Sequence, residues 1–278
     1  MTDVPTVQLN DGTEIPQLGF GVWQVPADDA ERVVAEALKV GYRHIDTAAI
    51  YGNEEGVGRA IAASGIPREE LWVTTKLWVG DFKEGNTKQA LRTSLEKLGL
   101  DYVDLYLIHW PSPEDAAYVK AYQDMEELKA EGLTRSIGVS NFLPEHLDAV
   151  IGASSTVPSV NQIEVHPALQ QRDVQEANAS HGTATQAWSP LAQGEVFGDE
   201  PIVAAAEAHG VNPAQVIIRW HLQRGRILFP KSVTPERIAS NFDVFGFELS
   251  EEELSAIDGL ERDGRRGAHP ATFNPASQ

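Results

Sequence analysis

Apolar side chains recur along this chain with the period of an α-helix in some stretches and as short unbroken runs in others. Within residues 30–38 the apolar positions fall at i, i+3, i+4, i+7 and i+8, and Gly41 follows them. This spacing predicts an amphipathic helix that ends at the glycine. The segment 43–46, which follows this glycine, is then expected to be a strand. The same order recurs, with further helices expected around 87–98 and 118–128.

Short apolar runs of this kind predict eight strands. Strands that alternate with helices form a parallel sheet, because each connection must cross one face of it. No linker or break in composition divides the series, which favours a closed (β/α)8 TIM barrel, a single domain spanning residues 1–278, over an open doubly wound sheet. The predicted strands are 18–21, 43–46, 71–76, 103–109, 134–139, 160–163, 183–188 and 227–229.

The two ends of the chain depart from this pattern. Asp11 and Gly12 lie between short apolar segments at 7–9 and 13–15. Asp-Gly in such a place is typical of a β-hairpin turn, because both residues tolerate a positive φ. After about Asp263 the sequence is rich in Gly, Pro and polar residues, which predicts an irregular C-terminal tail.

Composition narrows the classes of function. Among 278 residues, Lys and Arg number 22 and Asp and Glu number 41, which gives a formal net charge of −19. A surface of that sign repels nucleic acid and anionic lipid, so we expect neither nucleic acid nor a membrane as a partner. The sequence has no Cys, which excludes a thiol nucleophile, a disulfide and a thiolate metal site.

Further absences guide the prediction. The sequence shows no leader-like amino terminus and no long apolar run, so we expect a cytoplasmic protein. We also expect a monomer that carries out its reaction without metal. It also lacks G-x-G-x-x-G, G-x-x-x-x-G-K-[ST], H-E-x-x-H and G-x-S-x-G. Without these motifs there is no support for a Rossmann dehydrogenase, a P-loop NTPase, a zinc protease or a serine hydrolase.

Four polar side chains stand at or just after the ends of consecutive predicted strands. Asp46 ends the second strand, Tyr51 follows it, Lys76 ends the third and His109 ends the fourth. In a (β/α)8 barrel the reactive groups lie at the carboxyl ends of the strands, so these four can converge. Each also has a simpler explanation by itself: a solvated lysine, a core histidine beside a tryptophan, or a tyrosine that caps the barrel.

Together the four side chains favour the addition of hydride to a carbonyl group. A tyrosine titrates near ~10 and is a weak proton donor at pH 7, and a neighbouring ammonium such as that of Lys76 lowers this pKa. Asp46 would keep Lys76 charged and in place. His109 would hydrogen-bond the carbonyl oxygen, and Tyr51 would protonate the alkoxide as it forms.

Seven further blocks of sequence follow one another along nearly the whole chain. They are GYRHIDTAAIYGNEEGVGRAI, LWVTTKLW, VDLYLIHWP, GLTRSIGVSNF, VNQIEVHP, WSPLAQG and FPKSVTPERIASN. In this order they resemble the aldo-keto reductases, and within that family the chain looks most like the bacterial 2,5-diketo-D-gluconate reductases, partly because Trp188 stands where most members carry Tyr. The resemblance implies an NADPH-dependent carbonyl reductase on a (β/α)8 barrel, with Tyr51 as general acid and Lys76, Asp46 and His109 around it.

The resemblance also implies which residues hold NADPH or NADP+. Ser140, Asn141 and Gln162 match the residues that hold the nicotinamide carboxamide, and Trp188 would stack on the ring. Where related diketogluconate reductases tend to carry a further Arg, this chain has Thr234, so the 2′-phosphate is expected to rely on Lys231 and Arg237. The remaining positions match the pyrophosphate cover (Ser189, Leu191, Gln193 and Gly194) and the adenosine end (Lys231, Ser232, Val233, Thr234, Arg237 and Asn241).

Aromatic residues after the predicted strands indicate an apolar substrate cleft around His109. The tail would close this cleft, and its arginines would offer a cation to an anionic sugar acid. Packing in the core or at the rim explains the same aromatic residues equally well. The expected cleft residues are Trp23, Ala49, Trp78, Phe82 and Trp110, and the tail arginines are Arg262, Arg265 and Arg266.

The function predicted from the sequence is the NADPH-dependent reduction of an aldehyde or ketone to an alcohol, with a 2,5-diketo-D-gluconate reductase as the nearest example. Three alternatives remain. The protein could reduce methylglyoxal and other aldehydes, or bind NADPH as a redox sensor without turnover. It could also be a barrel isomerase or lyase that uses Lys76 as a Schiff base.

Overall fold

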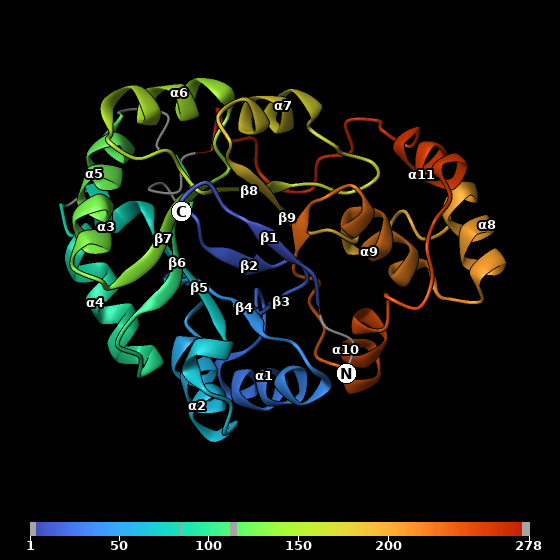
Figure 1. Ribbon diagram of the computed structural model, residues 1–278, viewed down its shortest axis with the longest axis horizontal. Coiled ribbons are helices and arrows are strands. Elements are labelled where there is room, and N and C mark those ends of the chain that lie inside the picture. Colours follow the sequence, from blue (N-terminus) through green and yellow to red (C-terminus); the bar gives the residue numbers. More distant parts are fainter. Residues whose placement is uncertain (1–3, 84, 112–115, 274–278) are drawn as a thin grey trace.

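The computed structural model describes residues 4–83, 85–111 and 116–273. Eight parallel strands form one sheet in the order β10-β9-β8-β7-β6-β5-β4-β3, and helices surround it on the outside (Figure 1). The strands are β3 (Phe20–Gly21), β4 (His44–Asp46), β5 (Trp72–Leu77), β6 (Val103–Ile108), β7 (Thr134–Ser140), β8 (Val160–Glu164), β9 (Ala184–Trp188) and β10 (Ile227–Leu228).

The two edges of this sheet meet and close it into a barrel. Leu18, just before β3, forms a parallel bridge with Leu228 of β10. The Gly19 N–H donates to the Leu228 carbonyl at 2.8 Å, and the Leu228 N–H donates to the Gln17 carbonyl at 2.9 Å. The predicted (β/α)8 barrel is therefore confirmed.

The helices cover the outer face of the barrel, and α1 shows why they form where they do. Its buried side chains are those of the predicted apolar stripe, and Gly41 follows the last turn with a φ of 131°, which ends the helix. The α-helices are α1 (Ala27–Val40), α2 (Glu54–Ala63), α3 (Val79–Lys83), α4 (Thr87–Leu98), α5 (Ala117–Ala130), α6 (Pro144–Ala153), α7 (Arg172–Ser180), α8 (Glu200–His209), α9 (Pro213–Gln223), α10 (Pro235–Phe242) and α11 (Glu251–Asp258). The short 3-10 helices are η1 (Ala49–Tyr51), η2 (Arg68–Glu70) and η3 (Ala192–Gly194).

Close packing between α2 and α4 depends on Gly58. A Cβ atom built at this glycine would lie 2.2 Å from the Leu98 carbonyl oxygen. Any larger residue would therefore push α2 away from α4. Because α2 begins shortly after η1, this packing also fixes the turn that carries Tyr51.

The predicted hairpin consists of the antiparallel strands β1 (Thr6–Gln8) and β2 (Glu14–Pro16). It covers the amino-terminal end of the barrel, where Leu9 and Ile15 enter a small apolar cluster with Trp72 and other strand residues. Asp11, in the turn, ties the hairpin to the barrel. Its carboxylate accepts hydrogen bonds from the Thr13 hydroxyl (2.7 Å), the Lys129 ammonium (2.7 Å) and the Ser159 hydroxyl (3.1 Å).

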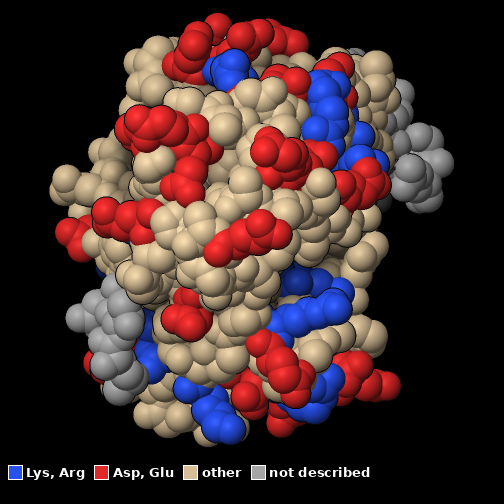
Figure 2. Space-filling model, turned by 90° about the vertical axis from the view of Figure 1, so that its right-hand side faces the viewer, with Lys and Arg blue, Asp and Glu red and all other residues tan. Residues whose placement is uncertain are grey.

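Acidic side chains are spread over the face of the molecule that carries α8 and α11, and fewer basic groups lie among them (Figure 2). This distribution agrees with the net charge of −19. It means that an anionic ligand must be held by local cations, because the general field opposes it. None of the helices in the described ranges is long and apolar enough to cross a membrane.

We predict that Asp11→Asn lowers the free energy of unfolding at pH 7 by about 1 to 2 kcal/mol. Burial alone would raise the pKa of Asp11, but hydrogen bonds from Lys129 and Thr13 outweigh it and lower the pKa to about 2. A carboxyl group with a depressed pKa stabilises the fold above its unfolded pKa of ~3.9, and this contribution is lost as the pH falls toward ~2. Urea unfolding at several pH values measures the effect.

Glu31→Gln is the matched control, because Glu31 pairs with Arg59 on the exposed surface. Its effect is expected to stay within about 0.5 kcal/mol. If wild type and Asp11→Asn differ by the same amount at pH 7 and pH 2.5, the ionised carboxylate is not what ties the hairpin to the barrel.

Candidate active site

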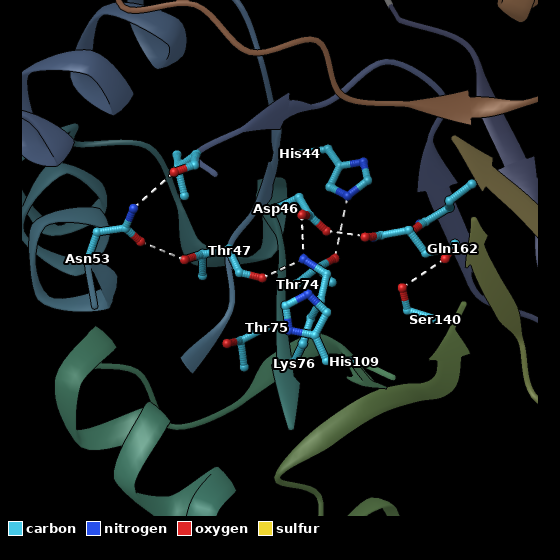
Figure 3. A network of polar contacts seen from close by, with 12 residues as sticks. His44, Asp46, Thr47, Asn53, Thr74, Thr75, Lys76, His109, Ser140 and Gln162 are labelled. Atoms are coloured by element: carbon cyan, nitrogen blue, oxygen red, sulfur yellow. Dashed lines mark hydrogen bonds and ion pairs between the residues drawn. The ribbon is translucent and has the colours of Figure 1, made fainter. Parts of the chain in front are cut away.

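A buried ion pair joins the carboxyl ends of β4 and β5. Asp46 is the last residue of β4, and Lys76 lies next to the last residue of β5. Lys76 Nζ is 2.5 Å from Asp46 Oδ1 and donates a second hydrogen bond to the Thr47 carbonyl at 2.7 Å (Figure 3). The Lys76 side chain is 0% exposed. Its charge is therefore balanced by Asp46 and not by water.

The second carboxylate oxygen of Asp46 is held by strands farther round the barrel. Gln162 Nε2, on β8, donates to Asp46 Oδ2 at 2.8 Å and also to Gln186 Oε1, on β9, at 3.0 Å. Burial raises the pKa of Asp46 and lowers the pKa of Lys76, while their mutual attraction opposes both shifts. Both carboxylate oxygens have hydrogen-bond donors, which is the condition under which a buried ion pair persists.

Tyr51 is presented by the short helix η1, which lies between β4 and α2. Its ring centroid is 5.1 Å from Lys76 Nζ. The turn is braced by Asn53, which accepts from the Thr47 hydroxyl at 3.0 Å and donates to the Val22 carbonyl at 2.9 Å (Figure 3). The next residue, the buried Glu54, accepts from the Thr75 hydroxyl at 2.6 Å. The phenol is therefore held at a fixed height above β5.

The pKa of Tyr51 corrects one expectation from the sequence. Burial and the nearby Asp46 carboxylate raise it well above its ordinary value of 10.0. The sequence predicts that Lys76 lowers this pKa, but in the structure the Lys76 charge is compensated by Asp46 in the ion pair. Tyr51 is consequently a protonated phenol at neutral pH, and none of the described residues hydrogen-bonds its hydroxyl.

His109 follows β6 and completes the group. Its ring packs edge-to-face against Tyr51 (centroids 5.6 Å apart) and Trp78 (5.4 Å apart). Burial and the positive charge of Lys76 lower the pKa of His109 well below 6.5, so the ring is neutral at pH 7. Its Nδ1 is buried and has no hydrogen-bond partner among the described residues. Nε2 is therefore the ring nitrogen available to a ligand.

These side chains face a cavity of about 940 Å³ at the carboxyl ends of the strands. Asp46, Tyr51 and His109 line it, as do Trp23 and Trp110 from the expected substrate cleft. All of the predicted cofactor residues line the same cavity, namely Ser140, Asn141, Gln162, Trp188, Ser189, Leu191, Gln193, Gly194, Lys231, Ser232, Val233, Thr234, Arg237 and Asn241.

Four predicted site residues lie outside the lining of this cavity. Lys76 is buried behind Asp46. Ala49 is partly buried in η1, and Phe82 packs in the hydrophobic core. Trp78 reaches the site only through its ring contact with His109.

Asn141 positions the Trp188 indole. Trp188 Nε1 donates to Asn141 Oδ1 at 2.9 Å, and Asn141 Nδ2 donates to the His109 carbonyl at 3.0 Å. The Ser140 hydroxyl donates to the Gln162 carbonyl at 2.7 Å (Figure 3). The sequence indicated Asn141 only as a cofactor contact. In the structure Asn141 also connects His109, which follows β6, to Trp188, the large aromatic residue of the cavity wall, through two hydrogen bonds.

The loop after β9 has an unusual backbone. Ser189, Ala192 and Gln193 have positive φ values of 47°, 48° and 54°, and Gly194 continues with 91°. Left-handed backbone is costly for residues other than glycine, so the surrounding structure must hold it in place. The Gly194 N–H donates to the Leu191 carbonyl at 2.8 Å, which closes this turn against the cavity.

Cations around the cavity fall into two groups. The three tail arginines are paired: Arg262 with Asp199 at 2.9 Å, Arg265 with Glu164 at 3.9 Å, and Arg266 with Glu195. Of these three, Arg266 lines the cavity. Lys231 and Arg237, at the other end, are exposed, and no described carboxylate lies within ion-pair distance of them.

Several lining residues were not predicted from the sequence. Gly21, Phe197, Phe229 and Phe273 are small or apolar residues in loops or at strand ends, where nothing distinguishes them from packing residues. In the described part of the chain, no cluster of three or more His, Asp or Glu side chains is arranged to hold a metal ion.

Comparison with known proteins identifies the family. The model of the Aldo/keto reductase family matches residues 17–262. An aldo-keto reductase of Mycolicibacterium smegmatis is 55% identical over 270 residues, which cover 97% of this chain and 98% of the relative. Methylglyoxal reductase DkgA of Yersinia pestis is 54% identical over 275 residues, which cover 98% and 99%.

A solved structure is also similar to this chain in fold and sequence. A Gox0644 mutant in complex with NADPH has a TM-score of 0.94 and 46% identity to this chain, covering 98% of this chain and 100% of that one. The family resemblance seen in the sequence is thereby confirmed. This chain belongs to the aldo/keto reductase family and is an oxidoreductase.

Proposed function

We propose that this chain reduces aldehydes or ketones to alcohols with NADPH, and that Tyr51 is the proton donor. The observation that carries the proposal is the convergence of Tyr51, His109 and the Asp46–Lys76 pair on one cavity. Reduction of a carbonyl group needs a hydride at its carbon and a proton at its oxygen. When bound, NADPH supplies the hydride, and the residues of the chain supply the rest.

His109 and Tyr51 act in different ways on the carbonyl oxygen of the substrate. His109 is neutral, and its Nε2–H can donate a hydrogen bond to this oxygen and polarise the bond. Tyr51, kept protonated by its raised pKa, gives its hydroxyl proton to the oxygen as negative charge develops there. The phenolate that remains takes a proton back from water, and Lys76 lies beside it, with Nζ 5.1 Å from the Tyr51 ring centroid.

The cavity residues fit a phosphorylated dinucleotide. Its volume of about 940 Å³ is at the upper end of the range for small-molecule sites, ~300 to 1,000 Å³. Trp188 offers a flat aromatic wall for a nicotinamide ring. Lys231 and Arg237, unpaired with any described carboxylate, offer charge to a 2′-phosphate in a molecule whose net charge opposes it.

Two substrate classes belong to the proposal. The sequence resemblance favours a 2,5-diketo-D-gluconate, whereas relatives named methylglyoxal reductase favour a small neutral aldehyde. A sugar acid needs a cation near the substrate, and Arg266 is the described tail arginine that lines the cavity. Its guanidinium is already paired with Glu195, which works against a carboxylate ligand.

The experiment that tests the proposal is NADPH oxidation, followed by absorbance, with a panel of methylglyoxal, glyceraldehyde and 2,5-diketo-D-gluconate. Turnover with stoichiometric alcohol formation is expected. A single stoichiometric oxidation without turnover would favour a redox sensor. Borohydride trapping of substrate on Lys76 would favour a Schiff-base enzyme. The ratio of kcat/KM values decides between the sugar acid and the aldehydes.

We predict that Tyr51→Phe keeps its affinity for NADPH and loses about 10² to 10⁴-fold in kcat, the usual value of a positioned proton donor. Tyr102→Phe, outside the cavity, is the matched control and should retain wild-type kcat. Residual Tyr51→Phe activity within a few-fold of wild type would assign the proton to another group.

Lys76→Met should lose activity and also lower the free energy of unfolding by about 3 to 5 kcal/mol, because it leaves the Asp46 charge buried without its partner. The double variant Asp46→Leu, Lys76→Met removes both charges. We expect the double variant to recover most of the stability and none of the activity. Recovery of both would mean that the pair serves only the fold.

Arg237→Ala should weaken NADPH binding by about tenfold or more and leave NADH binding nearly unchanged, since a charged hydrogen bond contributes roughly 1.5 to 3 kcal/mol. Isothermal titration with both cofactors measures the difference, and the salt dependence of NADPH binding should flatten. Lys39→Ala, an exposed cation on α1, is the control. If the binding of NADPH and NADH weakens equally, Arg237 contacts the adenine ring or stabilises the loop, and does not bind the 2′-phosphate.

A further inference from the structure

The C-terminal tail forms one wall of the cavity. It docks first on the loop after β8, where the Arg262 and Gly264 N–H groups donate to the Ala168 carbonyl at 3.2 and 2.8 Å. Farther along, the Phe273 ring packs against Trp110 with centroids 4.5 Å apart. Between these contacts the tail crosses the carboxyl end of the barrel, and its lining residues are Arg266, Gly267, Ala268 and Phe273.

One buried side chain holds the middle of this tail. Glu164, the last residue of β8, is 0% exposed. Its Oε1 accepts the Arg266 N–H at 2.7 Å, and its Oε2 accepts the Gly267 N–H at 2.9 Å. Burial alone would raise the pKa of Glu164, but hydrogen bonds from His166 and from these two N–H groups outweigh it and lower the pKa. The carboxylate is therefore ionised and grips two successive backbone groups.

None of the described groups that contact the Glu164 carboxylate belongs to a barrel strand. His166 Nε2, 3.1 Å from Glu164 Oε1, lies in the loop after β8, and the Arg265 guanidinium, 3.9 Å from Oε2, lies in the tail. A buried carboxylate is costly, and the strands of the barrel pair without it. The Glu164 carboxylate therefore holds the tail and the loop after β8.

The tail is held against the Trp188 indole. A Cβ atom built at Gly267 would lie 2.3 Å from Trp188 Cη2, so the backbone there touches the ring. The other edge of the same indole is fixed by its hydrogen bond to Asn141. Glu164, through Gly267, thus fixes the distance between the tail and the aromatic wall.

We propose that Glu164 is a positioning residue that sets the width of the substrate end of the cavity and so determines how well a bulky carbonyl compound binds. The inference rests on the proposed function. A three-carbon substrate with its carbonyl group at Tyr51 and His109 fills little of the cavity beyond them. A substrate with an aromatic ring extends toward Trp110, Phe273 and the tail, and it depends on that wall.

The test compares methylglyoxal with phenylglyoxal, which differ only by a phenyl group in place of the methyl group. Glu164→Gln keeps the size of the side chain but offers one acceptor oxygen to two N–H donors. We expect the KM for phenylglyoxal to rise about tenfold, since a wall misplaced by about 1 Å can cost up to ~10²-fold. The KM for methylglyoxal and the Kd for NADPH should stay within about twofold of wild type, well under the 1.4 kcal/mol of a tenfold change.

Asp199→Asn is the matched control, because it changes a carboxylate to an amide at another tie of the tail, the partly exposed pair with Arg262 outside the cavity lining. It should alter neither KM. If Glu164→Gln raises both KM values together or weakens NADPH binding in parallel, Glu164 serves the whole fold and the inference is overturned. If the wild type reduces glyceraldehyde or 2,5-diketo-D-gluconate but neither glyoxal, the inference is overturned while the proposed function stands. If it reduces none of these compounds, both fail.

A second measurement keeps the inference testable if Glu164→Gln does not fold. In the wild-type enzyme the amides of Arg266 and Gly267 should exchange with deuterium at least about 10²-fold more slowly than in an unstructured peptide, because both are bound to a buried carboxylate. Exchange at the unstructured rate would show that the tail is not held, and would overturn the proposal.

Discussion

The constraint that organises this molecule is the need to keep two opposite charges, Asp46 and Lys76, next to one another without water. Each would be costly alone in the barrel, and together they require further donors and acceptors. Thr47 gives Lys76 a carbonyl, and Gln162 gives the carboxylate an amide donor from across the barrel. Thr47 and Gln162 are thus engaged by this pair, while Tyr51 and His109 face the cavity beside it.

The two ends of the barrel serve different needs. At the amino-terminal end the hairpin seals the interior with apolar side chains and the ties of Asp11. At the carboxyl end β4, β5, β7, β8 and β9 deliver polar side chains from rigid positions, and loops and the tail cover them. Because neighbouring parallel strands end at the same edge, residues 30 or more positions apart, such as Asp46 and Lys76, arrive within hydrogen-bond distance.

The sequence predicted those elements and site residues whose positions depend on the local pattern of apolar and polar residues. The pattern of apolar residues located the strands, and the strand ends then located Asp46, Lys76 and His109. This works because the carboxyl ends of all the strands meet at one end of a (β/α)8 barrel, where the site lies. The pKa of Tyr51 could not be predicted in the same way, since its direction depends on the burial of the phenol and on the nearby Asp46 carboxylate, and both are known only from the folded structure. In the sequence nothing distinguishes Glu164 from other residues at the ends of strands. Its tail partners lie about a hundred residues away in an irregular segment, and no local pattern could pair them.

The backbone of the loop after β9 bears on how this enzyme would respond to engineering. Ser189, Ala192 and Gln193 hold left-handed conformations that cost about 1 to 2 kcal/mol each for residues with a Cβ atom. Glycine usually loosens a protein, yet at Ala192 or Gln193 it would relieve this strain, so the familiar rule for thermostable variants is reversed there. A search for heat-resistant forms of this enzyme that excluded glycine would overlook positions where the folded backbone favours it.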